Sequence, residues 1–232
     1  MHSLTQGQAM LSFWDANKKL PWCPHPGVWQ VPGMYDDMTI KPLSFSPPGI
    51  GFDIDGVVAD TMAAFLRIAR EEYGHGHLEK ERITSYWLEE CLDIPPETVG
   101  AIIQRILDDP FGVGLEPING ARDVLLRFAA KGPLTFVTAR PSGESIEEWL
   151  RDLLPEVPQE DLRVIATGRH AAKKYVLREL GIDAFVEDNL ETCEDLHAAG
   201  MLAAVFDQPW NRARTPWIRV GSWEEILALT GE

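Results

Sequence analysis

The chain has 232 residues, of which 45% are hydrophobic and 25% are charged, and its 36 acidic and 21 basic side chains give a formal net charge of −15. The length suits one large domain or two small ones, and the composition is that of an ordinary soluble globular protein. The acidic excess argues against binding to a nucleic acid polymer, which needs a basic face. A local cleft can still hold a small phosphorylated substrate.

The three cysteines, Cys23, Cys91 and Cys193, are far apart and form no metal-ligand pair. Reduced thiols in a cytoplasmic protein are the simplest interpretation. We see neither the basic and apolar segments of a signal peptide nor the roughly 20 apolar residues of a membrane span. We therefore expect a cytoplasmic protein without a membrane partner.

Residues 1–48 differ in composition from the rest of the chain. They contain seven of the 17 prolines and three of the eight tryptophans. Prolines at this density exclude long helices and central strands, whereas so many tryptophans are unlike a free disordered tail. We expect an extended arm that its aromatic residues hold to the body, and it could also serve as a strap between copies of the chain. A loose terminal extension is the alternative.

The next segment, residues 49–60, combines a strand pattern with acidic residues. A short apolar run from Ile50 to Ile54 predicts a buried strand, and Asp53 and Asp55 lie at its carboxyl end. In an extended chain, side chains two residues apart point to the same side. Since α/β proteins bind ligands at the carboxyl ends of their strands, two acids there indicate a metal site or acid–base chemistry.

Residues 61–118 show helical periodicity and no strand signal. Apolar residues recur at helical spacing from Met62 to Tyr73, and one or two further helices are expected within residues 80–109. His75 and His77 lie in a glycine-rich break that predicts a loop tip. The segment is therefore a helical insertion between the first strand and the next.

From residue 119 onwards, short apolar strands alternate with amphipathic helices. Strands are predicted at residues 134–137, 162–166, 184–186, 203–206 and 217–220. This alternation predicts right-handed βαβ units, hence an α/β fold: a Rossmann-like three-layer sandwich with a mainly parallel sheet, plus a small helical cap inserted after the first strand. The domains would be an arm (1–48), a core (49–60 and 119–232) and the cap (61–118).

In such a sheet, all strand-end loops open at one edge, which brings the acids together. Asp188 ends the fourth of the expected strands, counting from the first, and so joins Asp53 and Asp55. Converging carboxylates repel one another unless a cation lies among them, and ligands that are all oxygen select Mg²⁺. For any single Asp the simpler interpretation is a turn or a helix cap, but it weakens when three strand-end acids share the same chemistry.

Other strand-end residues could hold an anion. Thr138 offers a hydroxyl and a backbone N–H, and Lys173 or Lys174 could supply a cation at the start of a helix. Metal, nucleophile, hydroxyl and ammonium together suit phosphoryl transfer. An Asp can attack phosphorus itself, and a second acid can move the proton.

These residues carry a family resemblance. The segments Phe52 to Asp60, Val137 to Arg140, Lys173, and Glu187 to Asn189 resemble the four ordered motifs of the haloacid dehalogenase superfamily, over about residues 50–230. The ending Phe206 to Arg212 resembles its 5′(3′)-deoxyribonucleotidase branch. The insertion at 61–118 is similar in place to the cap domain of that superfamily, which would put substrate selectivity there. Candidates for lining the pocket are His75, His77, Tyr86 and Trp87, and a core or surface role is the equal alternative for each.

The resemblance implies a role for each matching position. Asp53 would be the nucleophile and a Mg²⁺ ligand, and Asp55 the general acid/base that also gives its backbone carbonyl to the metal. Thr138 would bind the phosphoryl group, and the spacing of Lys173 to the following Gly181 favours it over Lys174 for stabilising that group. The remaining implied roles concern the metal and the leaving group: Asp188 as a metal ligand, and Arg140 and Asn211 in the leaving-group pocket. Glu187 stands where relatives often have a second Asp, which leaves its role open.

We therefore expect a Mg²⁺-dependent phosphatase of a small phosphomonoester, such as a nucleoside 5′-monophosphate, that works through an aspartyl-phosphate. A phosphotransferase or mutase of the same superfamily is the first alternative. A non-catalytic, nucleotide-binding regulatory module is the second, although such a module would not need to keep Asp55.

Overall fold

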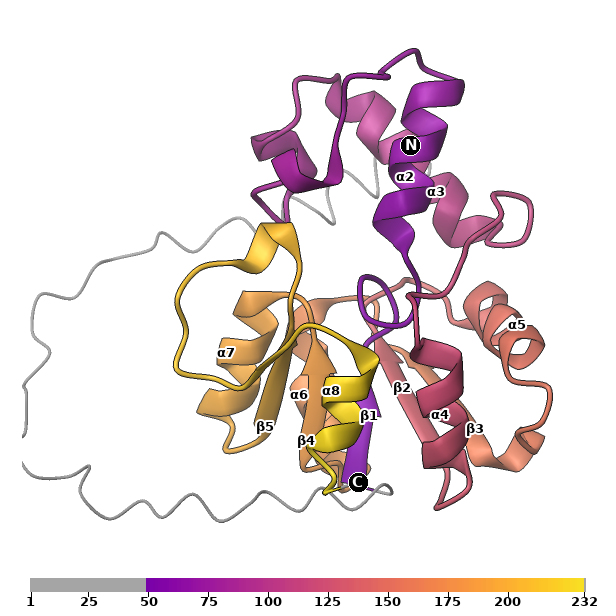
Figure 1. The fold of residues 1–232 in the computed structure, drawn as a ribbon, viewed down its shortest axis with the longest axis vertical. Helices are drawn as coiled ribbons and strands as arrows, with labels where there is room; N and C mark the ends of the chain where they lie inside the picture. The colour runs from indigo at the N-terminus through magenta and orange to yellow at the C-terminus, as the bar shows by residue number, and fades with distance from the viewer. Residues whose placement is uncertain (1–48, 232) are drawn as a thin grey trace, which may run out of the picture. The chain divides into compact units, whose positions relative to one another are not determined.

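The computed structural model of the chain describes residues 49–231, so the expected arm at 1–48 and its role as a strap lie outside the described residues. The described part contains a six-stranded parallel sheet with the order β3-β2-β1-β4-β5-β6 (Figure 1). The α/β class and the parallel sheet predicted from the sequence are confirmed. The strands are β1 (Ile50–Phe52), β2 (Leu134–Thr138), β3 (Leu162–Ala166), β4 (Ala184–Glu187), β5 (Leu202–Phe206) and β6 (Arg219–Val220).

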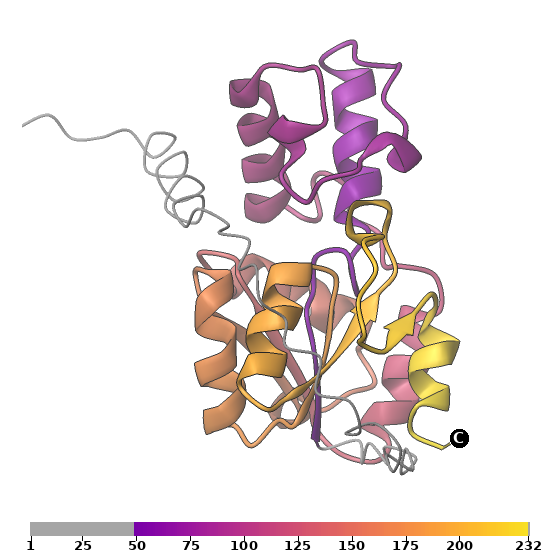
Figure 2. The ribbon, with the colours of Figure 1, turned by 90° about the vertical axis from the view of Figure 1, so that its left-hand side faces the viewer.

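Helices cover both faces of the sheet, which gives three layers (Figure 2). Two separate clusters of buried apolar side chains fill the spaces between the layers. One cluster lies under α4 and α8 and includes apolar residues of α5, and the other lies under α6 and α7. These helices are α4 (Ala121–Ala129), α5 (Glu144–Leu153), α6 (Lys173–Glu179), α7 (Leu190–Ala198) and α8 (Trp223–Ala228).

The central strand β1 is fixed by aromatic packing. The ring of Phe52, which is 1% exposed, lies 5.6 Å from Phe128, 6.0 Å from Phe136 and 5.3 Å from Trp223, measured between centroids. Burial of such rings stabilises a core by a few kcal/mol each, of order 3–5 kcal/mol for truncation to Ala. Because Phe52 directly precedes Asp53, this packing also fixes where the first acid emerges from the sheet.

The segment 61–118, predicted as a helical insertion, lies between β1 and β2. It contains α2 (Thr61–Glu71), α3 (Pro96–Asp108) and two 3₁₀ turns, Lys80–Arg82 and Leu88–Glu90. The two connections to the core run side by side, since the backbone N–H of Asp60 donates to Glu116 O at 2.9 Å and that of Ile118 to Val58 O at 2.7 Å. In the described part of the chain, no helix has the apolar length that crossing a bilayer requires.

The strand order indicates at which edge of the sheet a ligand-binding crevice lies. The chain passes from β1 outward to β2 and β3, then returns to β4 on the other side of β1. Such a reversal of strand order leaves a crevice at the carboxyl ends of the two strands that flank it, here β1 and β4. Asp53 directly follows β1 and Asp188 directly follows β4, so both acids open into this crevice.

Candidate active site

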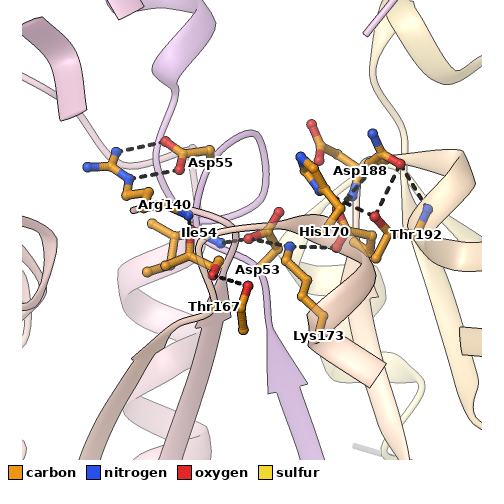
Figure 3. Close-up of polar contacts among 12 residues, drawn as sticks. Asp53, Ile54, Asp55, Arg140, Thr167, His170, Lys173, Asp188 and Thr192 are labelled. Carbon is orange, nitrogen blue, oxygen red and sulfur yellow. Dashed lines mark hydrogen bonds and ion pairs between the residues drawn. The ribbon is translucent and has the colours of Figure 1, made fainter. Parts of the chain in front are cut away.

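The centre of the crevice is a buried ion network around Lys173 (Figure 3). The Nζ atom of Lys173 lies 2.9 Å from Oδ1 of Asp53 and 2.8 Å from Oε2 of Glu187. Lys173 and Glu187 are fully buried, and Asp53 is 3% exposed. Burial alone would lower the pKa of Lys173, but the charges of Asp53 and Glu187 raise it overall, so the side chain is an ammonium.

This geometry separates the two neighbouring lysines. The Nζ atom of Lys174 lies 3.1 Å from Asp195 Oδ2 at the surface, away from the network. Glu187, whose role was open in the sequence, holds Lys173 with one oxygen. Its other oxygen, Oε1, accepts hydrogen bonds from the backbone N–H groups of Asp188 (3.2 Å) and Asn189 (3.0 Å). Glu187 therefore fixes both the cation and the turn that presents Asp188.

Asp188 has one oxygen occupied and one free. The indole N–H of Trp210 donates to Oδ2 of Asp188 at 3.0 Å. The other oxygen, Oδ1, is buried and has no hydrogen-bond partner among residues 49–231. A buried carboxylate oxygen without a hydrogen-bond partner is costly, and a role as a cation ligand is one of the few arrangements that explain it.

The three carboxylates of Asp53, Glu187 and Asp188 each offer an oxygen within 4.8 Å of the others. Burial, followed by the charge of Glu187, raises the pKa of both Asp53 and Asp188 well above the usual range. A cation among them would remove this repulsion, and a donor set made of oxygen alone suits a hard divalent ion. The residues present therefore fit a metal at this position.

Asp55 does not share this environment. The sequence suggested that Asp53 and Asp55 point to the same side, but β1 ends at Phe52 and the chain turns before Gly56, so the extended spacing is lost. Figure 3 shows the two carboxylates directed to different partners. Arg140 binds Asp55 through two bonds, Nε to Oδ2 at 2.8 Å and Nη2 to Oδ1 at 2.7 Å.

The contacts of Asp55 favour its ionised form. Burial alone would raise its pKa, but the guanidinium of Arg140 and the hydroxyl of Thr61, which donates to Oδ1 at 2.5 Å, lower it overall. Arg140 also donates to the carbonyl of Leu107 at 3.4 Å. Arg140, expected in the leaving-group pocket, thus connects Asp55 to the last turn of α3.

Thr138 ends β2 at the same edge of the sheet. It is 1% exposed, and its hydroxyl accepts a hydrogen bond from the backbone N–H of Arg140 at 3.2 Å. Its carbonyl accepts from the backbone N–H of Thr167 at 2.8 Å and from the Thr167 hydroxyl at 2.9 Å. These bonds hold the ends of β2 and β3 together beside the network.

Asn211 lies behind Asp188 instead of in the open crevice. Its amide N–H groups donate to the carbonyls of Asp188 (2.7 Å) and Phe206 (2.8 Å), and Oδ1 accepts from the backbone N–H of Gln208 (3.1 Å) and from Arg219 (2.7 Å). These contacts use the donors and acceptor of a residue that is 1% exposed. Its expected contact with a leaving group stays a prediction.

Sequence reasoning missed His170 at this edge of the sheet, and it gave Tyr86 of the insertion only as a candidate for lining the pocket. His170 Nε2 lies 3.3 Å from the hydroxyl of Tyr86 in the insertion, and its Nδ1 lies 3.3 Å from the hydroxyl of Thr192. Burial and then the charge of Lys173 lower the pKa of His170 to about 4, so the ring is neutral at pH 7. A lone His in a strand-end loop gives no signal of this pairing, because Tyr86 is 84 residues away.

Comparison with known families agrees with the geometry. The family model described as "5' nucleotidase, deoxy (Pyrimidine), cytosolic type C protein" matches residues 48–230. The chain is 28% identical over 182 residues to the 5'(3')-deoxyribonucleotidase of Bacillus subtilis, covering 76% of this chain and 95% of that protein. It is 23% identical over 184 residues to a nucleotidase of Clostridium acetobutylicum, covering 78% and 92% of the two chains.

Solved structures with the same fold include two hydrolases. A HAD family hydrolase from Deinococcus radiodurans, solved with bound phosphate and sodium, matches with a TM-score of 0.55 and 18% identity, covering 82% of this chain and 97% of that one. A HAD-superfamily hydrolase of subfamily IA from Geobacter sulfurreducens matches with a TM-score of 0.51 and 21% identity, covering 78% and 95%. At these identities the likeness concerns the fold.

Proposed function

The chain belongs to the cytosolic type C 5′ nucleotidase family, within the haloacid dehalogenase superfamily, and is thus a phosphoric monoester hydrolase; we propose that it hydrolyses nucleoside monophosphates with Mg²⁺ as cofactor through an aspartyl-phosphate. The family match also agrees with the resemblance of the sequence motifs. The observation that carries the proposal is the buried network in which Asp53 shares the ammonium of Lys173 with Glu187, beside the unpartnered oxygen of Asp188. The names of the relatives support deoxyribonucleotides as the substrate class.

The metal would be held by side-chain oxygens of Asp53 and Asp188, with Glu187 close by, and by the backbone carbonyl of Asp55. When bound, Mg²⁺ would neutralise charge on the phosphoryl oxygens and on the acids around them. We choose Mg²⁺ because the donors are hard oxygens and because phosphate substrates commonly complete its coordination.

Asp53 is the proposed nucleophile. Its carboxylate oxygen attacks phosphorus in line with the ester oxygen, a P–O bond forms to Asp53, and the bond to the nucleoside oxygen breaks. The backbone N–H of Ile54 donates to Oδ1 of Asp53 at 2.8 Å and Lys173 lies at 2.9 Å, so this oxygen is fixed and Oδ2 is left to attack. Fixing the nucleophile in this way removes part of the entropic barrier.

Asp55 is the proposed proton carrier. Its carboxyl group gives a proton to the departing nucleoside oxygen in the first step, and its carboxylate takes a proton from water in the second, when water attacks phosphorus and releases phosphate from Asp53. The contacts with Arg140 and Thr61 favour the carboxylate, the form needed in the second step. Thr138, at the end of β2, would bind a phosphoryl oxygen.

The insertion at 61–118 is proposed to act as the cap that selects the substrate. Its Tyr86 reaches the core at His170, next to the loop that leads into Lys173. A nucleoside bound through its phosphate at Asp53 would therefore meet the insertion with its other end.

The test is phosphate release from a panel of substrates with and without Mg²⁺. The panel comprises 5′- and 3′-monophosphates of deoxyribonucleosides and ribonucleosides, sugar phosphates and phosphoglycolate. We expect Mg²⁺-dependent release that is greatest for the nucleotides and is abolished in Asp53→Asn. The matched control is Asp183→Asn, an exposed acid at the opposite end of β4. Equal, metal-independent rates in wild type and Asp53→Asn would refute the proposal, and phosphate transfer to an added alcohol without release would favour a phosphotransferase.

A further inference from the structure

The two oxygens of Asp188 have unlike surroundings. Oδ2 accepts the indole N–H of Trp210, which is 9% exposed, at 3.0 Å. Oδ2 also faces Gly56, where a methyl group would lie 2.2 Å from Oδ2 and 3.3 Å from the indole ring. Oδ2 thus lies against both the indole and a backbone position that has room for hydrogen alone.

The backbone at Gly56 is itself held in place. Its φ of +77° is in the left-handed region that favours glycine. Its carbonyl accepts a hydrogen bond of 2.7 Å from the side-chain amide of Gln208, which is 4% exposed. The surroundings of Oδ2 are therefore built from fixed parts, and Oδ1 remains as the oxygen that can meet a cation.

We propose that Trp210 is a positioning residue that makes Asp188 a one-oxygen ligand and so favours Mg²⁺ over Ca²⁺ at the site. This inference rests on the proposed metal site and adds a determinant of its selectivity. Mg²⁺ needs near-octahedral geometry with short bonds of about 2.1 Å, which single carboxylate oxygens satisfy. Ca²⁺ takes six to eight oxygens at about 2.3–2.6 Å and often binds a carboxylate through both of them.

The indole of Trp210 opposes the binding of a cation through both oxygens of Asp188. For Asp188 to chelate a cation through both oxygens, Oδ2 would have to share its lone pairs between the cation and the N–H of Trp210, which weakens that hydrogen bond. Weakening the hydrogen bond of a buried donor is destabilising. That penalty falls on Ca²⁺, because Mg²⁺ leaves the Trp210 bond intact. Orienting partners of metal ligands commonly change metal affinity by about 10–100-fold.

The experiment compares Mg²⁺ and Ca²⁺ binding to the full chain by calorimetry and by the rise in Tm. In Trp210→Phe we expect Mg²⁺ affinity to fall about tenfold and Ca²⁺ affinity to stay unchanged or to rise, so the Mg²⁺/Ca²⁺ affinity ratio should fall about tenfold or more. The matched control is Trp149→Phe, which breaks an indole bond of the same 3.0 Å length, to Leu115 O, at a similarly buried site. That variant should keep the wild-type ratio.

A ratio in Trp210→Phe equal to that of wild type would overturn the inference. If that variant does not fold, ¹⁵N-tryptophan labelling of wild type gives the answer: the Trp210 indole N–H should stay protected from exchange with Mg²⁺ and exchange faster with Ca²⁺. Equal protection with both ions would also overturn the inference. If neither ion binds wild type at all, the proposed metal site fails instead, which separates the two claims.

Discussion

The ammonium of Lys173 lies 2.9 Å from Oδ1 of Asp53, and the side chain of Lys173 is fully buried. The neighbouring Lys174 reaches Asp195 at the surface, at 3.1 Å, with its side chain 27% exposed. Two consecutive lysines thus have opposite environments, one inside a network of acids and one in solvent. This contrast allows the role of the network to be tested with a closely matched control.

Lys173→Met should destroy activity and destabilise the fold. Removing one partner of a buried ion pair leaves uncompensated charge and costs about 3–5 kcal/mol. Lys174→Met should cost at most about 1 kcal/mol, because an exposed pair contributes little, and it should keep activity. Urea unfolding measures the change in stability, and phosphate release measures the change in activity. Loss of activity in Lys174→Met with activity retained in Lys173→Met would contradict the assignment of Lys173 to the site.

Mg²⁺ should raise Tm more at about pH 8 than at about pH 5. The pKa values of Asp53 and Asp188 are raised in the folded chain, first by burial. The protonated forms of these two acids therefore stabilise the folded chain fully below pH 3.8, their pKa in the unfolded chain. This contribution is lost as the pH rises through their pKa in the folded chain. A cation compensates for this loss at the higher pH, whereas protons compete with it at the lower pH.

Thermal scans with and without Mg²⁺ at the two pH values measure this difference. Asp188→Asn, which removes a proposed ligand, is expected to abolish most of the Mg²⁺ effect. Glu187 behaves in the opposite sense: burial alone would raise its pKa, but Lys173 lowers it, so its contribution is lost as pH falls below 4.5 through the folded value. A Mg²⁺ effect that is larger at acid pH would contradict the account.

Arg140→Gln should move the pH–rate profile to higher pH. Burial already acts to raise the pKa of Asp55, and Arg140 opposes it, so removing the guanidinium lets the pKa rise. Asp55 must carry a proton at the start of the first step and be ionised at the start of the second. Each limb of the pH–rate profile that depends on Asp55 should therefore move to higher pH. Arg212→Gln, an exposed arginine, is the control. A uniform fall in rate without any shift would give Arg140 a purely structural role.

Tyr86→Ala should impair nucleotides more than small aryl phosphates. The hydroxyl of Tyr86 meets His170 at 3.3 Å where the insertion reaches the core. If the Tyr86 side chain contacts the nucleoside as proposed, losing this contact would lower kcat/KM for nucleotides by roughly tenfold or more. The kcat/KM for p-nitrophenyl phosphate, which lacks a nucleoside, should change less. The control is His77→Ala at the exposed loop tip. Equal losses for both substrates would argue against a selective role of the insertion.

Most of the fold could be predicted because the strands are short, continuous apolar runs. Leu162–Ala166 was predicted with its observed bounds, and the other strands within one or two residues at each end. The first strand was predicted two residues too long, because β1 ends at Phe52 and not at Ile54. The hydrogen bonds that end it are local turns to Ile54 O, from Val58 and Ala59 at 2.8 Å each, which an apolar pattern does not reveal.

The candidate site was less predictable where it depends on long-range contacts. Strand-end position indicated Asp53, Thr138 and Asp188. The contact of Arg140 with Asp55 spans 85 residues, and that of Trp210 with Asp188 depends on the path of the loop after β5. Such pairings are set by tertiary packing, so the sequence did not indicate the contact of Arg140 with Asp55 and left Trp210 unassigned.

The central claim is that Asp53 becomes phosphorylated, and the direct measurement is a rapid acid quench of Asp55→Asn with a ³²P-labelled aryl phosphate. The aryl leaving group needs no proton, so the first step should proceed while hydrolysis of the intermediate is slowed. We predict close to one acid-stable, hydroxylamine-labile phosphate per chain, on the peptide that contains Asp53, and none in the Asp53→Asn, Asp55→Asn double variant. Phosphate release without any protein-bound phosphate, or with phosphate on another residue, would contradict the account.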